Sequence, residues 1–229
     1  MKYKIISIIV VILFITQSLF VESFAEDAKV YKKSLGSSKK IALTFDDGPH
    51  PRLTPKILAL LDEYDVRATF FVIGENVKNY SEAMRMLSET DHEIGNHTFS
   101  HRILKGISLD DIEREVSSCN QLLQENFGIN VSLLRPPQGR FDSSLQGLLG
   151  DMGYDIILWN IDTRDWEHTP ASNIAKNVLG NVSGGDIILM HDYIAGNSPT
   201  CDALRIIIPE LLERGYEFVT VSELLRDEI

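Results

Sequence analysis

Short apolar runs rich in β-branched residues alternate along this chain with longer segments whose apolar positions recur at helical spacing. The segment that opens at Thr54-Pro55 shows the second pattern, because Ile57, Leu58 and Leu61 fall on one side and proline suits a first helical turn. The pattern predicts strands at 40–45, 68–73, 93–95, 133–134, 155–161, 186–190 and 217–219. It predicts further helices at 81–89, 108–127, 142–152, from 169 onward, and at 202–214.

Alternating strands and helices are typical of a parallel sheet with crossover helices. Polar clusters come at the ends of several predicted strands, and the carboxyl ends of parallel strands meet at one edge. A ring of such strand ends favours a barrel, with an open doubly wound sheet as the alternative. The clusters are 44–49 (TFDDGP), 97–101 (HTFSH), 135–139 (RPPQG), 162–166 (DTRDW) and 188–191 (ILMH).

The N-terminal segment 1–25 has the features of a secretory signal peptide. Lys2 and Lys4 precede the apolar run 5–15, and small residues near Ala25 predict cleavage before the next residue. An uncleaved membrane anchor is the alternative, although the run is short beside the roughly 20 residues that a spanning helix needs. The folded part is therefore expected to be secreted or associated with the cell wall, without strong membrane association after cleavage.

Composition limits the remaining chain further. Residues 26–39, rich in Lys and Ser, are expected to form an exposed lead-in, and residues 40–229 one α/β domain. Removing 1–25 takes away two of the 22 basic and one of the 33 acidic residues, so the net charge becomes −12. Such a charge argues against nucleic acid as a partner and favours a neutral or cationic substrate.

The mature segment contains two cysteines, Cys119 and Cys201. An exported protein can form a disulfide, but Cys119 lies in a helical pattern and the sequence does not show whether the two are close. Free thiols that pack as small apolar groups are the favoured interpretation. Neither cysteine has metal-ligand spacing to the other, so a metal, if bound, is not held by thiolates.

Asp46 and Asp47 follow an apolar strand and precede Gly48-Pro49. Asp-Gly-Pro alone is ordinary turn chemistry. Adjacent carboxylates at a barrel mouth repel each other, however, unless a cation or a shared proton compensates. A metal ligand beside a general base is one physical resolution of that repulsion.

His97 and His101 are four residues apart, so one helical turn would place both on a single face. Two imidazoles with the Asp47 carboxylate would make three protein ligands and leave a position for water, as in catalytic zinc sites. Taken singly, Arg135 could be a surface ion pair, Asp165 and Trp166 a solvated turn, and His191 a satisfied polar residue that closes an apolar strand.

Together the five clusters closely resemble the polysaccharide deacetylases of carbohydrate esterase family four, the NodB-like domain, from about residue 40 to 225. The resemblance implies an irregular, TIM-like (β/α) barrel of about seven parallel strands. It implies one divalent metal ion, usually Zn²⁺ with Co²⁺ or another ion able to serve, and an N-acetylated polysaccharide as substrate. The implied metal ligands are Asp47, His97 and His101.

The resemblance also implies catalytic roles. Asp46 resembles the base, Arg135 the residue that orients it, and His191 the general acid held by Asp165. The walls of the acetyl pocket would be Trp166 and Leu189. Gln138 stands where the family commonly carries Tyr, and its backbone N–H would help to hold the oxyanion. The absent aromatic ring puts sugar contacts at this position in doubt.

These residues predict an exported N-deacetylase of N-acetylglucosamine polymers such as peptidoglycan or chitin-type oligosaccharides. Two alternatives stay open, an O-acetyl esterase acting on xylan and a catalytically silent wall-binding protein. The sequence does not fix the polymer, the preferred chain length, the native metal or the oligomeric state.

Overall fold

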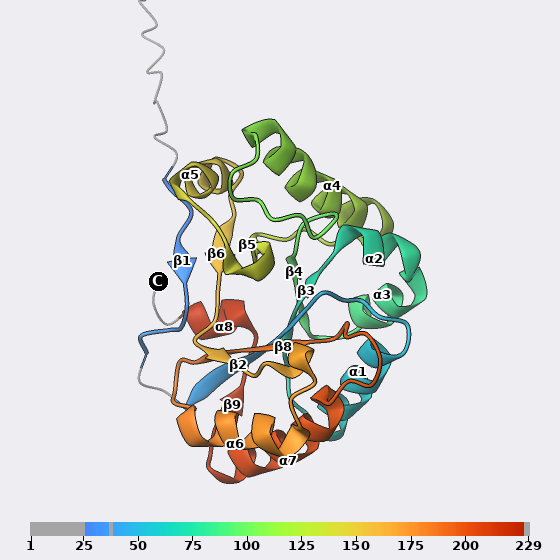
Figure 1. Cartoon of the computed structure of the whole chain (residues 1–229), viewed down its shortest axis with the longest axis vertical. Coiled ribbons are helices and arrows are strands. Elements are labelled where there is room, and N and C mark those ends of the chain that lie inside the picture. Colours follow the sequence, from blue (N-terminus) through green and yellow to red (C-terminus); the bar gives the residue numbers. More distant parts are fainter. Residues whose placement is uncertain (1–25, 37–38, 227–229) are drawn as a thin grey trace, which may run out of the picture.

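A curled parallel sheet forms the centre of the protein, in a computed structural model that describes residues 26–36 and 39–226 (Figure 1). The strand order is β1-β6-β5-β4-β3-β2-β8-β7, with β9 paired to β2, and every pair of strands is parallel. The strands are β1 Val30–Tyr31, β2 Lys40–Asp46, β3 Thr69–Val72, β4 Glu93–Asn96, β5 Leu133–Leu134, β6 Asp155–Ile157, β7 Ile161–Asp162, β8 Ile187–His191 and β9 Glu217–Phe218.

Helices connect the strands and surround the sheet in Figure 1, which makes the fold a distorted, partly open (β/α) barrel. The α/β barrel class expected from the sequence is therefore confirmed. The helices are α1 Leu53–Glu63, α2 Gly74–Asn79, α3 Ser81–Ser88, α4 Leu109–Phe127, α5 Ser143–Asp151, α6 Ala171–Asn181, α7 Thr200–Glu213 and α8 Val221–Leu225, with 3-10 turns η1 Pro137–Gly139 and η2 Asp165–Glu167.

Strands β2, β3 and β8 are covered on both faces, which explains their nearly unbroken apolar sequences. Helix α4 begins and ends as its sequence predicts. The Ser108 side chain accepts a hydrogen bond from the Asp111 N–H, and Gly128 closes the helix at φ 69°, where glycine is favoured. The short helices α2 and α8 were not predicted, because each has too few residues to show a helical period.

Two sequence predictions need correction. The strand expected at 155–161 is two strands, because β6 pairs with β5 and β1 whereas β7 pairs with β8 at the other end of the sheet. The intervening residues 158–160 therefore lead from β6, which lies next to the edge strand β1, to β7 at the opposite edge of the sheet. The lead-in is also not simply exposed, since β1 pairs with β6 and Ala28 and Ser34 are buried.

The signal-peptide prediction concerns residues 1–25, which lie outside the described part of the chain. Among the residues that are described, no helix has both the length and the apolar character needed to cross a membrane. Cys119 is buried and Cys201 is half-buried, and both are free thiols, as the sequence favoured.

Candidate active site

Four of the predicted polar clusters meet at the carboxyl edge of the central strands. Asp46 is the last residue of β2 and His191 the last of β8, and these two residues are register partners. His97 directly follows β4, and Arg135 directly follows β5. Parallel pairing brings these side chains to one edge although nearly 150 residues separate the first from the last.

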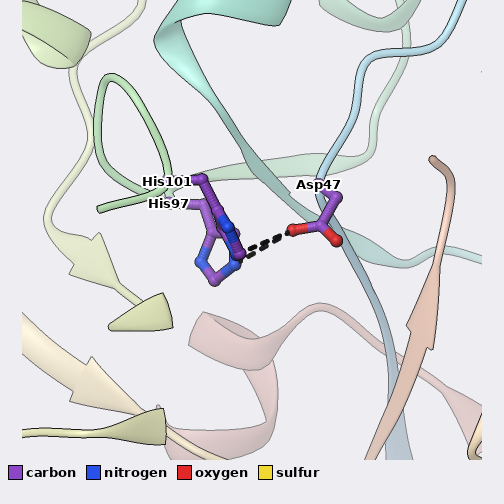
Figure 2. Close-up of side chains that lie close together, drawn as sticks. All are labelled: Asp47, His97 and His101. Atoms are coloured by element: carbon purple, nitrogen blue, oxygen red, sulfur yellow. Dashed lines mark ion pairs between the residues drawn. The ribbon is translucent and has the colours of Figure 1, made fainter. Parts of the chain in front are cut away.

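Asp47, His97 and His101 form the candidate metal site (Figure 2). Oδ1 of Asp47 lies 3.3 Å from Nε2 of His97 and 3.2 Å from Nε2 of His101, and the three ligand atoms lie within 4.8 Å of one another. His97 is buried, whereas the side chains of Asp47 and His101 are 26% and 37% exposed. The site is thus anchored inside the protein and open on one side, which suits a substrate.

The histidine pair does not lie on a helical turn, so that part of the sequence reasoning is wrong. Residues 97–101 form a loop in which Thr98 and His101 have left-handed backbones, with φ of 69° and 58°. Glu115 of α4 fixes the loop by accepting hydrogen bonds from the backbone N–H groups of Phe99 and Ser100. The two imidazoles converge through this loop geometry, which costs backbone strain and is typical of functional sites.

A hydrogen bond at Nδ1 fixes the orientation of the His97 ring. Its Nδ1 lies 2.7 Å from the backbone carbonyl oxygen of Arg135, which assigns the proton to Nδ1 and leaves the Nε2 lone pair facing Asp47. Asp47 itself has a left-handed backbone at φ 74°, and its carbonyl oxygen accepts a hydrogen bond from the Asn76 side chain of α2. The ligand atoms are therefore held in place by contacts outside the site.

These residues fit a divalent metal ion. Oδ1 of Asp47 is buried without a hydrogen bond in the described structure, although two imidazole nitrogens face it. Burial raises the pKa of Asp47, but the facing His97, His191 and His101 outweigh it, and the pKa lies below its ordinary value. An ionised carboxylate with two imidazoles is the donor set of an open zinc-type site, with room for further ligands.

Arg135 holds Asp46 beside this site. The guanidinium is fully buried, and its Nη1 donates to Oδ1 of Asp46 at 2.7 Å and to the hydroxyl of Thr44 at 2.8 Å. Its Nε and Nη2 donate to the carbonyl oxygens of Ile157 and Leu158. Oδ2 of Asp46 lies 3.7 Å from Nε2 of His97, so the carboxylate points one oxygen at arginine and the other at the metal ligands.

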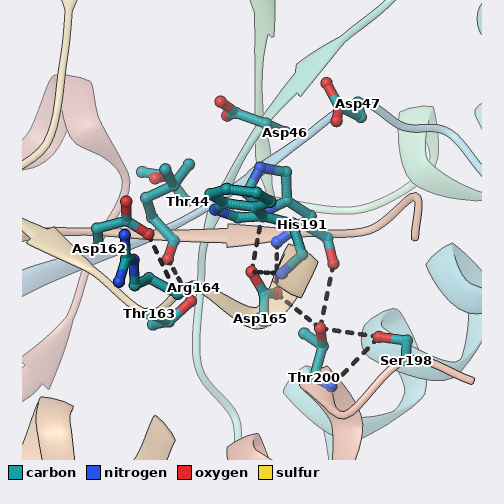
Figure 3. A network of polar contacts seen from close by, with 12 residues as sticks. Thr44, Asp46, Asp47, Asp162, Thr163, Arg164, Asp165, His191, Ser198 and Thr200 are labelled. Atoms are coloured by element: carbon teal, nitrogen blue, oxygen red, sulfur yellow. Dashed lines mark hydrogen bonds and ion pairs between the residues drawn. The ribbon is translucent and has the colours of Figure 1, made fainter. Parts of the chain in front are cut away.

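His191 and Asp165 form a second buried pair (Figure 3). Nδ1 of His191 lies 2.8 Å from Oδ1 of Asp165, whose Oδ2 accepts from the His191 backbone N–H and the Thr200 hydroxyl. Burial lowers the pKa of His191, but the hydrogen bond and charge of Asp165, with the charges of Asp46 and Asp47, raise it to about 9. The hydrogen bond and charge of Asp165 thus favour the protonated form of the imidazole.

The three predicted substrate residues occupy different environments. Leu189 is buried in β8, and Trp166 is 49% exposed in η2. The Gln138 side chain is exposed, and its backbone is left-handed at φ 60°, inside the short turn η1.

Sequence reasoning missed a buried support behind the Asp47 turn. Asp192 is fully buried beside Gly48, where an added Cβ would lie only 2.1 Å from its carboxylate, so this position has no room for a side chain. Its backbone N–H donates to the Asp46 carbonyl oxygen, and its Oδ2 accepts from the Thr54 hydroxyl. Burial, with the charges of Asp47 and Asp46, raises the pKa of Asp192 to about 7. Its position next to His191 was the only available signal.

The fold and site together define a metal-dependent hydrolase built on a distorted (β/α) barrel. A family model described as polysaccharide deacetylase matches residues 33–157, and the chain belongs to this family. The chain is 39% identical over 192 residues to a peptidoglycan-N-acetylglucosamine deacetylase of Bacillus cereus, covering 83% of this chain and 90% of that protein. It is 34% identical to a chitooligosaccharide deacetylase of Azorhizobium caulinodans, covering 79% and 91%.

Solved structures agree with these sequence matches. A peptidoglycan N-acetylglucosamine deacetylase in complex with an N-hydroxybenzamide compound superposes with a TM-score of 0.83 at 34% identity, over 86% of this chain and 92% of that one. A family 4 acetyl xylan esterase from Clostridium thermocellum, in complex with a cobalt ion, gives a TM-score of 0.74 at 38% identity, over 81% and 90%. The family resemblance and the enzymatic class expected from the sequence are confirmed.

Proposed function

We propose that this protein removes N-acetyl groups from N-acetylglucosamine residues of peptidoglycan or a chitin-type polymer and releases acetate. The arrangement that carries the proposal is the pair of buried carboxylate contacts, Asp46–Arg135 and His191–Asp165, beside the candidate metal site. One pair offers a fixed proton acceptor and the other a fixed proton donor. Hydrolysis of an unactivated amide needs both.

A divalent ion at Asp47, His97 and His101, most simply Zn²⁺, would supply a water nucleophile at neutral pH and polarise the acetyl carbonyl. Asp46 accepts the proton of the attacking water, and Arg135 keeps the carboxylate in position. His191 donates a proton to the departing amine nitrogen, and Asp165 holds the imidazolium. Water adds across the amide bond, so the products are acetate and a free amino sugar.

Three residues complete the proposed site. The backbone N–H of Gln138 helps to hold the oxyanion, and Trp166 and Leu189 form the walls of the pocket for the acetyl methyl group. The family resemblance supports these roles. The exposed Trp166 ring and the buried Leu189 side chain suit a pocket that is open to solvent on one side.

Gln138→Ala should keep turnover on short acetylated oligomers within about tenfold of wild type, because the substitution retains the backbone N–H. The exposed amide side chain has little buried contact to lose. Steady-state acetate release measures the effect. A loss near 10³-fold would show that the side chain is the oxyanion donor, since a lost donor costs roughly 10²–10³ in rate.

His191→Ser should fold, retain metal and lose at least about a hundredfold in rate on an amide substrate, because a general acid contributes about 10²–10⁴-fold. The loss should be smaller on an activated ester, whose leaving group departs without a proton. Stopped-flow or steady-state rates on both substrates measure the difference. Equal losses on the two substrates, or near-normal amide turnover, would remove His191 from the mechanism.

The same histidine predicts the alkaline limb of activity. Activity requires the protonated imidazole, so it should fall as pH rises through the pKa of His191, which is raised from the ordinary 6.5 to about 9. A bound cation would offset the contribution of Asp46 and Asp47, whereas that of Asp165 remains. The limb is thus expected between these two values in the pH profile of kcat.

The substrate is tested by acetate release from N-acetylglucosamine oligomers and from acetylated xylan under the same conditions. Faster release from the oligomers supports the proposal. The acetyl xylan esterase similarity is the observation that favours the second candidate, an O-acetyl esterase, and preferential release from xylan would establish it instead. A wall-binding protein without activity would release acetate from neither.

We also propose that the protein acts outside the cytoplasm, secreted or at the cell wall. The support is the signal-peptide pattern of residues 1–25 together with similarity to a peptidoglycan deacetylase. The N-terminal sequence of the mature protein, expected to begin at Glu26, tests this proposal against the retained anchor.

A further inference from the structure

Three aromatic rings gather on the loops beside the candidate active site. The ring centroids of His50 and Tyr193 are 4.8 Å apart with an edge-on interplanar angle of 85°. Tyr80 completes the group, at 6.3 Å from His50 and 6.2 Å from Tyr193. All three residues are half-buried, so each ring keeps a solvent-facing part. We call His50, Tyr80 and Tyr193 the aromatic cluster.

The members of the aromatic cluster lie close in sequence to residues of the candidate active site or of its supports. His50 comes three residues after Asp47, which limits their separation to about 11 Å, and Tyr193 comes two residues after His191. Tyr80 ends helix α2, the helix whose Asn76 binds the Asp47 carbonyl oxygen. The loops after β2 and β8 and the junction of α2 with α3 lie together on the right side of Figure 1.

The aromatic cluster is separate from the hydrophobic core. The other tyrosines that the structure describes, Tyr31, Tyr64, Tyr154 and Tyr216, belong to the core clusters or pack against them, whereas Tyr80 and Tyr193 do neither. Each of these two half-buried rings keeps part of its surface free for a partner. Partly exposed aromatic rings near an active site are commonly used in ligand recognition.

Local contacts fix the His50 ring. Its Nδ1 accepts hydrogen bonds from the backbone N–H groups of Arg52 and Leu53 at the start of α1, so the proton of the neutral ring is on Nε2. Its backbone N–H donates to the Thr54 hydroxyl at 2.7 Å. A ring held in this way loses little freedom on binding and keeps an N–H donor for a ligand.

Rigid, uncharged rings with polar tips fit a sugar. The axial C–H groups of a pyranose make an apolar face that packs on aromatic rings, while its hydroxyls bond to polar edges such as a tyrosine O–H. We propose that the aromatic cluster is a saccharide subsite that binds a sugar residue of the substrate at least two positions away from the residue being deacetylated. This inference rests on the proposed function, because it assigns another part of the same polymer.

The test compares acetate release from N-acetylglucosamine pentamer and dimer by metal-loaded wild type, Tyr193→Ala and Tyr80→Ala. Each variant should raise KM for the pentamer by about five- to tenfold more than KM for the dimer, because only the longer chain reaches the cluster. Tyr193→Phe keeps the ring and should restore most of the pentamer affinity. The matched control is Met86→Ala, which removes a side chain of 39% exposure from α3 outside the cluster.

A merely structural role for the rings would change both substrates equally and lower the unfolding temperature, and that result would overturn the inference. Calorimetry measures the affinity for the pentamer independently of turnover. This measurement separates the subsite inference from the proposed function. Tyr193-dependent binding in a wild type that releases no acetate would keep the subsite and overturn the proposed function. Acetate release, with pentamer binding that neither alanine variant changes, would overturn the subsite alone. A wild type that releases acetate but does not bind pentamer would also overturn the subsite alone.

Discussion

Asp46→Asn is expected to retain about one metal ion per chain and to lose nearly all turnover. Asparagine preserves the shape of the side chain and an oxygen for Arg135 but cannot accept the proton of the attacking water. General-base assistance is typically worth about 10²–10⁴-fold, and we expect the loss of kcat to lie in the upper half of that range. Metal analysis by mass spectrometry, with kcat on an acetylated oligomer, measures both properties.

A matched control variant makes this result specific. Asp47→Asn is the matched change one residue away and should weaken metal binding, because it removes the charged ligand. If Asp46→Asn lost the metal and Asp47→Asn kept it, the two roles would be reversed. Asp46→Asn also leaves the buried Arg135 charge without its carboxylate, which costs up to about 3–5 kcal/mol of stability. Rates should therefore be measured well below the unfolding temperature.

The double variant His97→Ala, His101→Ala is expected to lose both metal and activity. It removes two of the three protein ligands, and one carboxylate does not hold a catalytic metal ion in competition with water. Equilibrium dialysis against Zn²⁺ or Co²⁺ should give about one ion per chain for wild type and none for the variant. Stoichiometric metal in the double variant would place the metal elsewhere and refute the assigned site.

His92→Ala is a suitable control for histidine loss in general. His92 precedes β4 at the opposite end of that strand, and burial is the main reason that its pKa falls to about 4. It accepts a hydrogen bond from the Ala68 backbone N–H through Nδ1, so its loss should lower stability. The variant should still bind metal. This contrast separates a metal ligand from a structural histidine.

The sequence predicted the barrel class because strand and helix periods alternate clearly and buried parallel strands leave apolar runs. It missed the break between β6 and β7, since both strands continue one apolar pattern and only their partners differ. It also missed β1, where residues 30–31 are too few to show alternation. Pairing partners are decided by tertiary contacts, which a local pattern does not contain.

The candidate site was predictable as a set of residues but not as a geometry. The spacing of His97 and His101 suggested a helix, whereas the loop brings them together through left-handed Thr98 and His101. The contact between Asp192 and Thr54 that supports the site was not predicted, because it forms between segments 138 residues apart. A short sequence motif shows which side chains lie near the end of one strand. The fold determines which side chains from other segments support them.

Arg135 joins parts of the barrel that no strand pairing joins. Its guanidinium reaches Thr44 and Asp46 of β2 on one side and the Ile157 and Leu158 carbonyl oxygens on the other, although β3, β4 and β5 lie between β2 and β6 in the sheet. One side chain thus spans the interior of the curled sheet and limits how far it can flatten. A substitution at Asp46 therefore also removes one of the contacts through which Arg135 holds β2 near β6.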